Sequence, residues 1–255
     1  MVEAAKEQVR AYWSAEPCGS GLATAESGSR EFFLQVEAER YRREPFIHAF
    51  ADFGSWSGRN VLEIGVGLGT DLVQFARAGA LVKGVDLTES AVELVARRLE
   101  LEGLEAEVVV ADAERLPFDD GSFDLVYSWG VLHHTPNTEA AVAEVLRVLR
   151  PDGEARVMLY SRRSWVALGA WLRYAVGRGR PWRSFAAVLA EHMESPGTKA
   201  YTQSELNRLF SGFDEVRFVR FLTPYDRRVG GPLVRLAGTR FGWFVGAIAC
   251  VSDAG

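Results

Sequence analysis

The chain has 255 residues, 48% of them hydrophobic, which suits one large α/β domain or a smaller domain with an insertion. Its only cysteines, Cys18 and Cys250, exclude a disulfide framework and a thiolate metal site, and no segment has the pattern of a signal or transit peptide. The longest apolar run, at 241–251, is too short to span a bilayer, so we expect a soluble, cytoplasmic, globular protein, and its net charge is −5.

The first 58 residues are expected to form an N-terminal helical cap. Residues 31–53 carry regularly spaced aromatic and aliphatic side chains, which predict an amphipathic helix that Pro45 interrupts. This helix is expected to pack over the edge of a sheet or over a ligand.

Residues 59–160 alternate between short β-rich runs and helical patterns. The runs are continuously apolar, as in VLEI and ARVMLY, which is typical of parallel strands that helices cover on both faces. Thr88 or Asp86 can cap the helix that opens at Glu89, and Gly103 can close it. The fold class is therefore α/β, with a doubly wound, mostly parallel sheet.

The pattern changes after Tyr160. Helices are predicted over 164–176, 185–193 and 202–210, and these form a helical insertion at 161–212. Two apolar runs, FDEVRFVRFL and FGWFVGAIACV, predict the final strands within 213–255.

Three glycines follow the first predicted strand at every second position: Gly65, Gly67 and Gly69. Dinucleotide-binding loops use Gly-x-Gly-x-x-Gly, and Thr70 occupies the position of their third glycine. The loop therefore indicates a nucleotide ligand but fits the dinucleotide pattern poorly.

The ordered motifs resemble those of the class I S-adenosylmethionine-dependent methyltransferases of type 11, in the branch that acts on small molecules and quinones. The first motif is Glu63-Ile64-Gly65-Val66-Gly67-Leu68-Gly69, and acidic residues follow the next two strands at Asp86 and Asp112. GVLHHTP follows the fourth strand, and LRPDGEARV introduces the fifth. The resemblance covers about residues 59–160, a core expected to bind S-adenosyl-L-methionine within a Rossmann-like, seven-stranded sheet.

The resemblance implies a set of cofactor contacts at the strand ends, with Tyr12 or Trp13 as a lid. The expected contacts are Glu63, Gly65, Gly67, Asp86, Leu87, Asp112, Ala113, Ser128 and Tyr12. Asp86 is expected to accept hydrogen bonds from the ribose hydroxyls, Asp112 to face the adenine amino group, and Ser128 to present its backbone carbonyl. The alternatives are a helix cap for Asp86 and a surface position for Glu63.

Methyl transfer needs alignment, exclusion of water and sometimes a base, so a catalytic signature can be absent. His133 and His134 follow the fourth strand, where either can act as the base or merely bond to the backbone. No carboxylate cluster suits a metal. The segment after FDLV lacks the Asp/Asn-Pro-Pro-aromatic motif of enzymes that methylate nucleic acid, so that partner is not favoured.

Charge divides the chain unequally. Residues 1–150 carry 14 basic and 25 acidic side chains, net −11, whereas residues 151–255 carry 15 and 9, net +6. Residues 161–185 hold six arginines, no acid and several large aromatics, which suits a lid, a membrane interface or a lipid-like substrate. We expect methyl transfer to a small organic acceptor; the alternatives are a quinone or lipid acceptor and a non-catalytic cofactor-binding module. The sequence does not indicate an oligomeric state.

Overall fold

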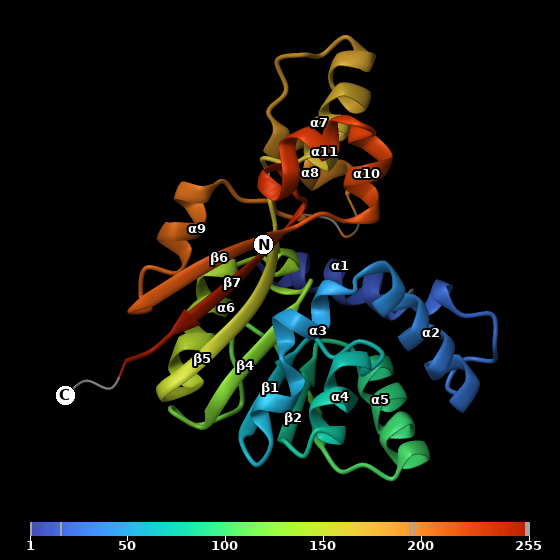
Figure 1. Ribbon diagram of the computed structural model, residues 1–255, viewed down its shortest axis with the longest axis vertical. Coiled ribbons are helices and arrows are strands. Elements are labelled where there is room, and N and C mark those ends of the chain that lie inside the picture. Colours follow the sequence, from blue (N-terminus) through green and yellow to red (C-terminus); the bar gives the residue numbers. More distant parts are fainter. Residues whose placement is uncertain (1, 16, 194, 196, 253–255) are drawn as a thin grey trace.

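The computed structural model describes residues 2–15, 17–193, 195 and 197–252 (Figure 1). Its strands form one seven-stranded sheet in the order β3-β2-β1-β4-β5-β7-β6. They are β1 Asn60–Ile64, β2 Leu81–Asp86, β3 Glu107–Val110, β4 Phe123–Trp129, β5 Leu149–Tyr160, β6 Glu215–Phe221 and β7 Phe244–Cys250. Strands β1 to β5 pair in parallel and β7 runs antiparallel to β5 and β6, which confirms the predicted mostly parallel sheet.

The strand order reverses between β1 and β4. The chain builds outward from β1 through β2 to β3, then returns to place β4 on the other side of β1. Such a reversal opens a crevice at the carboxyl ends of the strands, where open α/β sheets bind ligands. The glycine loop follows β1 and therefore lies at this crevice.

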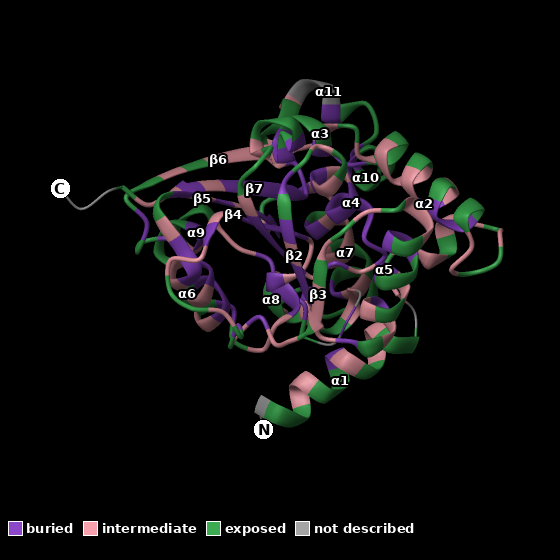
Figure 2. Cartoon of the chain, turned by 90° about the horizontal axis from the view of Figure 1, so that it is seen from below, coloured by how far each residue is buried: buried purple, intermediate pink, exposed green. Residues whose placement is uncertain are grey.

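Helices cover both faces of the sheet. Successive strand residues point to opposite faces, so Val61 and Leu125 pack in one hydrophobic cluster, while Leu62 and Val126 pack in another. The first cluster includes side chains from α3 Phe46–Ala51, α4 Thr70–Arg77 and α5 Glu89–Glu102. The second includes α6 Thr138–Val148 and α9 Gln203–Leu209. Figure 2 shows the buried residues concentrated along the central strands.

The N-terminal segment is helical, as predicted. It contains α1 Val2–Ala15, the 3-10 turns Ser20–Leu22 and Phe53–Trp56, α2 Arg30–Arg43 and α3. The predicted interruption at Pro45 is present, because α2 ends at Arg43 and α3 begins at Phe46. In α5, Thr88 is the N-terminal cap and Gly103, with φ of 67°, is the C-terminal cap.

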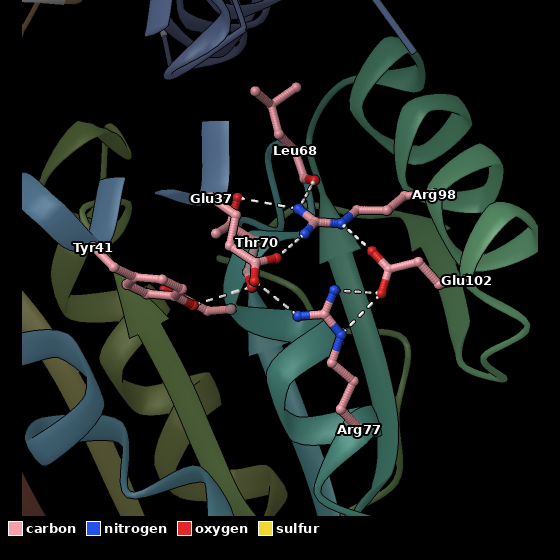
Figure 3. A network of polar contacts seen from close by, with 8 residues as sticks. Glu37, Tyr41, Leu68, Thr70, Arg77, Arg98 and Glu102 are labelled. Carbon is pink, nitrogen blue, oxygen red and sulfur yellow. Dashed lines mark hydrogen bonds and ion pairs between the residues drawn. The ribbon is translucent and has the colours of Figure 1, made fainter. Parts of the chain in front are cut away.

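A buried arginine joins the N-terminal helices to the core (Figure 3). The Arg98 side chain on α5 is fully buried and forms ion pairs with Glu37 of α2 and Glu102 of α5. It also donates to the Leu68 carbonyl and the Thr70 hydroxyl, each at 3.3 Å. Arg98 therefore connects α2 to the segment that carries the glycine loop.

Four helices, which we call the distal helices, gather beyond one end of the sheet in Figure 1. They are α7 Trp165–Tyr174, α8 Phe185–His192, α10 Pro224–Gly230 and α11 Leu233–Ala237. Short 3-10 turns lie between β4 and α6 at Leu132–His134, after α7 at Val176–Arg178 and after α11 at Gly238–Phe241. No helix among the described residues is both long and apolar enough to cross a membrane.

The two predicted final strands are present as β6 and β7, and α10 and α11, which the sequence analysis did not predict, lie between them. Thr223 begins α10 with a capping box, in which its side chain accepts from the Asp226 amide and the Asp226 side chain accepts from the Thr223 amide. Pro224 suits the first helical position. These helices are short and rich in glycine at their ends, so they have a weak periodic pattern.

Candidate functional site

A cavity of about 640 Å³ occupies the crevice at the carboxyl ends of the strands. Its walls come from α1, α2, the glycine loop, the ends of β2 to β5 and the distal helices. Nine of the predicted site residues line it: Tyr12, Glu63, Gly65, Gly67, Asp86, Leu87, Asp112, Ala113 and His134. Ser128 and His133 do not line it.

The glycine loop presents bare backbone to the cavity. Gly65 has φ of 80°, and a Cβ atom there would lie 2.2 Å from the Val131 side chain. Gly67 has φ of 52°, and a Cβ atom would enter open space. Both lie in the left-handed region that favours glycine. At Gly65 the missing Cβ atom makes room for Val131, whereas at Gly67 the bare backbone faces open space that a ligand can approach.

Glu63 is a buried carboxyl group at the cavity wall, with 4% of its surface exposed. Its Oε2 atom has no hydrogen-bond partner among the described residues. Burial, followed by the nearby Asp71 carboxylate, raises the pKa of Glu63 well above its ordinary value of 4.5. A buried acceptor of this kind is suited to a cationic or hydrogen-bond-donating group in the cavity.

Asp86 connects the glycine loop to the start of α5. Its Oδ2 accepts a hydrogen bond from the Gly67 amide at 3.0 Å, and its Oδ1 accepts from the Thr88 amide and hydroxyl at 3.0 and 2.9 Å. Thr88 is the N-terminal cap of α5, so the alternative role for Asp86, that of helix cap, is wrong. Its carboxylate remains part of the cavity wall.

Helix α1 crosses the carboxyl ends of β2 and β3. Lys6 forms ion pairs with Asp112 at 2.5 Å and Glu114 at 2.7 Å, and Arg10 donates to the Leu87 carbonyl at 3.3 Å. Trp13 lines the cavity beside Tyr12, with ring centroids 5.0 Å apart. Asp112 is therefore engaged by a side chain from α1, a contact that the sequence pattern did not predict.

Ser128 and His133 belong to the protein interior. The Ser128 hydroxyl donates to the Ile64 carbonyl at 3.1 Å and joins the ends of β1 and β4. His133 is fully buried, its two ring nitrogens have no hydrogen-bond partner among the described residues, and its ring lies 3.8 Å from the Tyr160 ring centroid. Burial, then His134 and Lys199, hold the pKa of His133 well below 6.5, so this ring is neutral at neutral pH.

His134 occupies a different environment from its neighbour. It lines the cavity, and its Nδ1 lies 2.7 Å from the Ser195 hydroxyl and 3.0 Å from the Thr198 hydroxyl. The ring packs edge to face with Trp13 of α1 at 5.2 Å. Two hydroxyl groups thus orient the ring at the cavity wall, so His134 can reach a bound molecule whereas His133 cannot.

The cavity beyond the β4 end is mainly aromatic and apolar. Its lining side chains there are Trp129, Met158, Tyr160, Val166, Met193, Tyr225, Trp243 and Phe244. Glu44 of the N-terminal segment accepts a hydrogen bond from the Trp129 indole at 3.1 Å. His192 of α8 also lines this cavity. This end suits a molecule with an apolar or aromatic body.

A polar network behind the glycine loop was missed by the sequence analysis. Asp71 is 1% exposed and accepts hydrogen bonds from Arg40 at 2.7 Å, Tyr41 at 2.9 Å and Tyr127 at 2.9 Å. Burial and then Asp71 raise the pKa of Tyr127 well above 10.0, so Tyr127 stays a hydrogen-bond donor. In the sequence, Asp71 is an acidic residue that closely follows the glycine loop, in GLGTD, and this position could have indicated the network.

No group of three or more histidine, cysteine, aspartate or glutamate side chains that could hold a metal ion is found among the residues that the structure describes.

Comparison with known proteins gives one family match, to the methyltransferase domain over residues 62–157. Methyltransferase GfsG of Streptomyces halstedii is 36% identical over 104 residues, which is 40% of this chain and 37% of that protein. Phthiotriol/phenolphthiotriol dimycocerosates methyltransferase of Mycobacterium leprae is 40% identical over 108 residues, 42% of this chain and 39% of that protein. The chain thus matches less than half the length of these curated relatives.

The fold is also that of solved proteins. A Haloferax volcanii protein solved in complex with the Trm112 methyltransferase activator matches with a TM-score of 0.67 and 17% identity. The match covers 97% of this chain and 99% of that one. At this identity the likeness concerns the fold, and it extends to the N-terminal and distal helices as well as the core.

Proposed function

The chain contains a methyltransferase domain with the class I fold, and from this premise we propose that it transfers a methyl group from S-adenosyl-L-methionine to a small organic acceptor. One observation carries the proposal. Glu63, Gly67 and Asp86, which come from two neighbouring strand ends, line one cavity and present a buried carboxyl oxygen, bare backbone and a carboxylate.

This set of groups fits the parts of S-adenosylmethionine. The unpartnered Glu63 oxygen suits the ammonium group, Gly67 leaves room for the sugar and methionine part beside Gly65, and Asp86 can accept from ribose hydroxyls. Asp112 and Ala113 would meet the adenine, with Tyr12 and Trp13 of α1 as the cover. Leu87 lines the same cavity, while Ser128 supports the loop from behind through the Ile64 carbonyl.

When bound, S-adenosylmethionine would supply a methyl group whose carbon the acceptor attacks in line, with S-adenosylhomocysteine as the leaving group. The residues of this chain align the acceptor, exclude water and accept its proton. His134 is the proposed base, since it lines the cavity and its Nδ1 is oriented by Ser195 and Thr198. His133 is proposed to support the ring of His134, whose centroid is 4.3 Å away.

Different segments of the chain form different walls of the cavity, and we assign their roles accordingly. Residues 59–160 would hold the cofactor, residues 1–58 would cover it, and residues 161–212 with 213–255 would enclose the acceptor. A lipid-like or quinone acceptor is the second candidate, because the acceptor end is aromatic and one relative is named for dimycocerosate lipids.

A transfer assay tests the proposal. The protein is incubated with methyl-labelled S-adenosylmethionine and a panel of phenols, amines, carboxylic acids, quinones and dispersed lipids. We expect label in at least one acceptor with the wild type and less label with Asp86→Ala when the cofactor is not saturating. Cofactor binding without transfer to any acceptor would instead support a non-catalytic binding module.

A further inference from the structure

The distal helices expose an unusual amount of apolar surface. Seven of the ten large hydrophobic side chains that are exposed in the described part of the chain lie between residues 168 and 233. Trp182, between α7 and α8, is 78% exposed. The other six are Leu168, Leu172, Val176, Tyr225, Val229 and Leu233.

These six side chains form two stripes with helical spacing. Leu168 and Leu172 lie one turn apart on α7, with Val176 in the turn after it, and Tyr225 and Val229 lie one turn apart on α10, with Leu233 at the start of α11. The stripes adjoin, because Gly169 of α7 packs so closely against Val229 that a Cβ atom would lie 2.6 Å away. We call these six residues and Trp182 the distal face.

The charges around the distal face are almost all positive. Residues 161–193 and 222–243 contain ten arginines, and their acidic residues are Glu191 and Asp226. Glu191 is paired with Arg183, and Asp226 is buried and accepts from the Thr223 and Trp243 amides. Five of the arginines are exposed close to the stripes: Arg173, Arg178, Arg180, Arg227 and Arg228.

The distal face is also continuous with the cavity. Tyr225 belongs to the exposed stripe, with 53% of its surface accessible, and it lines the cavity as well. Val166 of α7 lines the same region. A molecule held against the distal face would therefore lie near the acceptor end.

We propose that the distal face docks on an anionic lipid bilayer, with the apolar stripes and Trp182 in the headgroup boundary and the arginines on lipid phosphates. Apolar and tryptophan side chains flanked by arginine are the composition of interfacial helices. Charge complementarity favours this occupant over a second copy of the chain, because a two-fold contact would bring each arginine cluster against another. The inference deepens the proposed function, on which its link to a lipid-like acceptor rests.

Co-sedimentation with vesicles tests the docking without turnover or cofactor. The full chain is mixed with phosphatidylglycerol-containing vesicles or pure phosphatidylcholine vesicles at low and at high salt. We expect it to pellet with the anionic vesicles at low salt, and binding to fall by about tenfold or more at high salt or on the neutral lipid, since the attraction is screened.

Variants separate the contribution of the arginines to vesicle binding from that of the apolar side chains. Arg178→Glu with Arg180→Glu should weaken binding to anionic vesicles by at least about tenfold. Leu172→Ser with Val229→Ser should weaken it several-fold at both salt concentrations. Leu34→Ser, on α2 and 54% exposed, is the matched control and should bind like the wild type. Circular dichroism and calorimetric cofactor affinity check that each variant is folded.

Several outcomes would overturn the inference: absence of vesicle binding at low salt, equal binding by the charge-reversed variant, or a concentration-dependent dimer in ultracentrifugation that Leu172→Ser with Val229→Ser abolishes. If vesicle binding fails while cofactor binding and transfer to a soluble acceptor persist, only this inference is lost. If vesicles are bound but the cofactor is not, the proposed function fails instead.

Discussion

At the scale of single residues, the Asp86 carboxylate both holds the glycine loop in place and faces the cavity. It accepts three hydrogen bonds from Gly67 and Thr88 and also lines the cavity. We predict that Asp86→Ala weakens cofactor binding by about 1.5–3 kcal/mol, the usual contribution of hydrogen bonds to a charged group. Isothermal titration calorimetry with S-adenosylhomocysteine measures this, with the exposed Asp119→Ala as control. A folded Asp86→Ala protein that binds like the wild type would place the ribose contact elsewhere.

Glu63 gives a prediction about pH. Its pKa is raised in the folded protein, so the folded state holds its proton longer than the unfolded chain as pH rises above 4.5. The contribution of Glu63 to stability is therefore fully present below this value and is lost as pH rises through the folded-state pKa, by up to about 1.4 kcal/mol per pH unit. Glu63→Gln lacks this dependence.

Urea unfolding of both proteins between pH 4.5 and pH 8 tests the Glu63 prediction. The free energy of unfolding of the wild type should fall relative to that of Glu63→Gln with rising pH. A constant difference would mean that Glu63 ionises in the folded protein as readily as in the unfolded chain.

His134, the proposed base, gives a prediction about turnover. His134→Gln should lower turnover by about 10²–10⁴ with nearly unchanged cofactor affinity, as expected when a general base is lost. His48→Gln, on the exposed side of α3, is the control and should be neutral. Turnover is measured with an acceptor identified by the transfer assay. Wild-type turnover in His134→Gln would leave alignment alone as the source of catalysis.

At the scale of elements, Arg98 connects α2 and α5 to the segment around the glycine loop. Its side chain is fully buried between Glu37 and Glu102, so Arg98→Met removes a buried charge that both carboxylates share with Arg77 and takes a donor from the Leu68 carbonyl. We predict a loss of about 3 kcal/mol in the free energy of unfolding. Arg97→Met, whose exposed pair with Glu100 lies on the same helix, should cost less than about 1 kcal/mol. Equal losses by chemical denaturation would contradict this.

The elements that sequence periodicity predicts best are those buried on both sides. The alternation of apolar runs and amphipathic helices over residues 59–160 gave β1 to β5 and their helices, because continuous apolar strands have a distinctive pattern. It gave neither α10 nor α11, whose side chains at Tyr225, Val229 and Leu233 remain exposed. With seven and five residues, α10 and α11 are too short for an apolar periodicity to be distinguished from a loop.

At the scale of the whole molecule, the predicted cofactor residues that meet in one cavity lie, apart from Tyr12 of α1, at the carboxyl ends of β1, β2 and β3. Parallel strands bring Glu63, Asp86 and Asp112 to one edge, so sequence order alone was sufficient to group them. Contacts from α1 and α2 could not be predicted this way. The ion pair of Lys6 with Asp112 and the bond from Arg40 to Asp71 join residues 106 and 31 positions apart, and no local pattern specifies such distances.

The proposed function depends on which adenosine-containing cofactor the cavity binds, and a thermal shift measurement distinguishes S-adenosylmethionine from NAD. The wild-type protein is heated alone, with S-adenosylmethionine or S-adenosylhomocysteine, and with NAD. A ligand at about one hundred times its dissociation constant stabilises by roughly 2.7 kcal/mol, about 5–10 °C for a protein of this size. We predict a shift of this size with S-adenosylmethionine and its demethylated product and none with NAD. A shift with NAD and none with S-adenosylmethionine or S-adenosylhomocysteine would show that the protein is not an S-adenosylmethionine-binding protein.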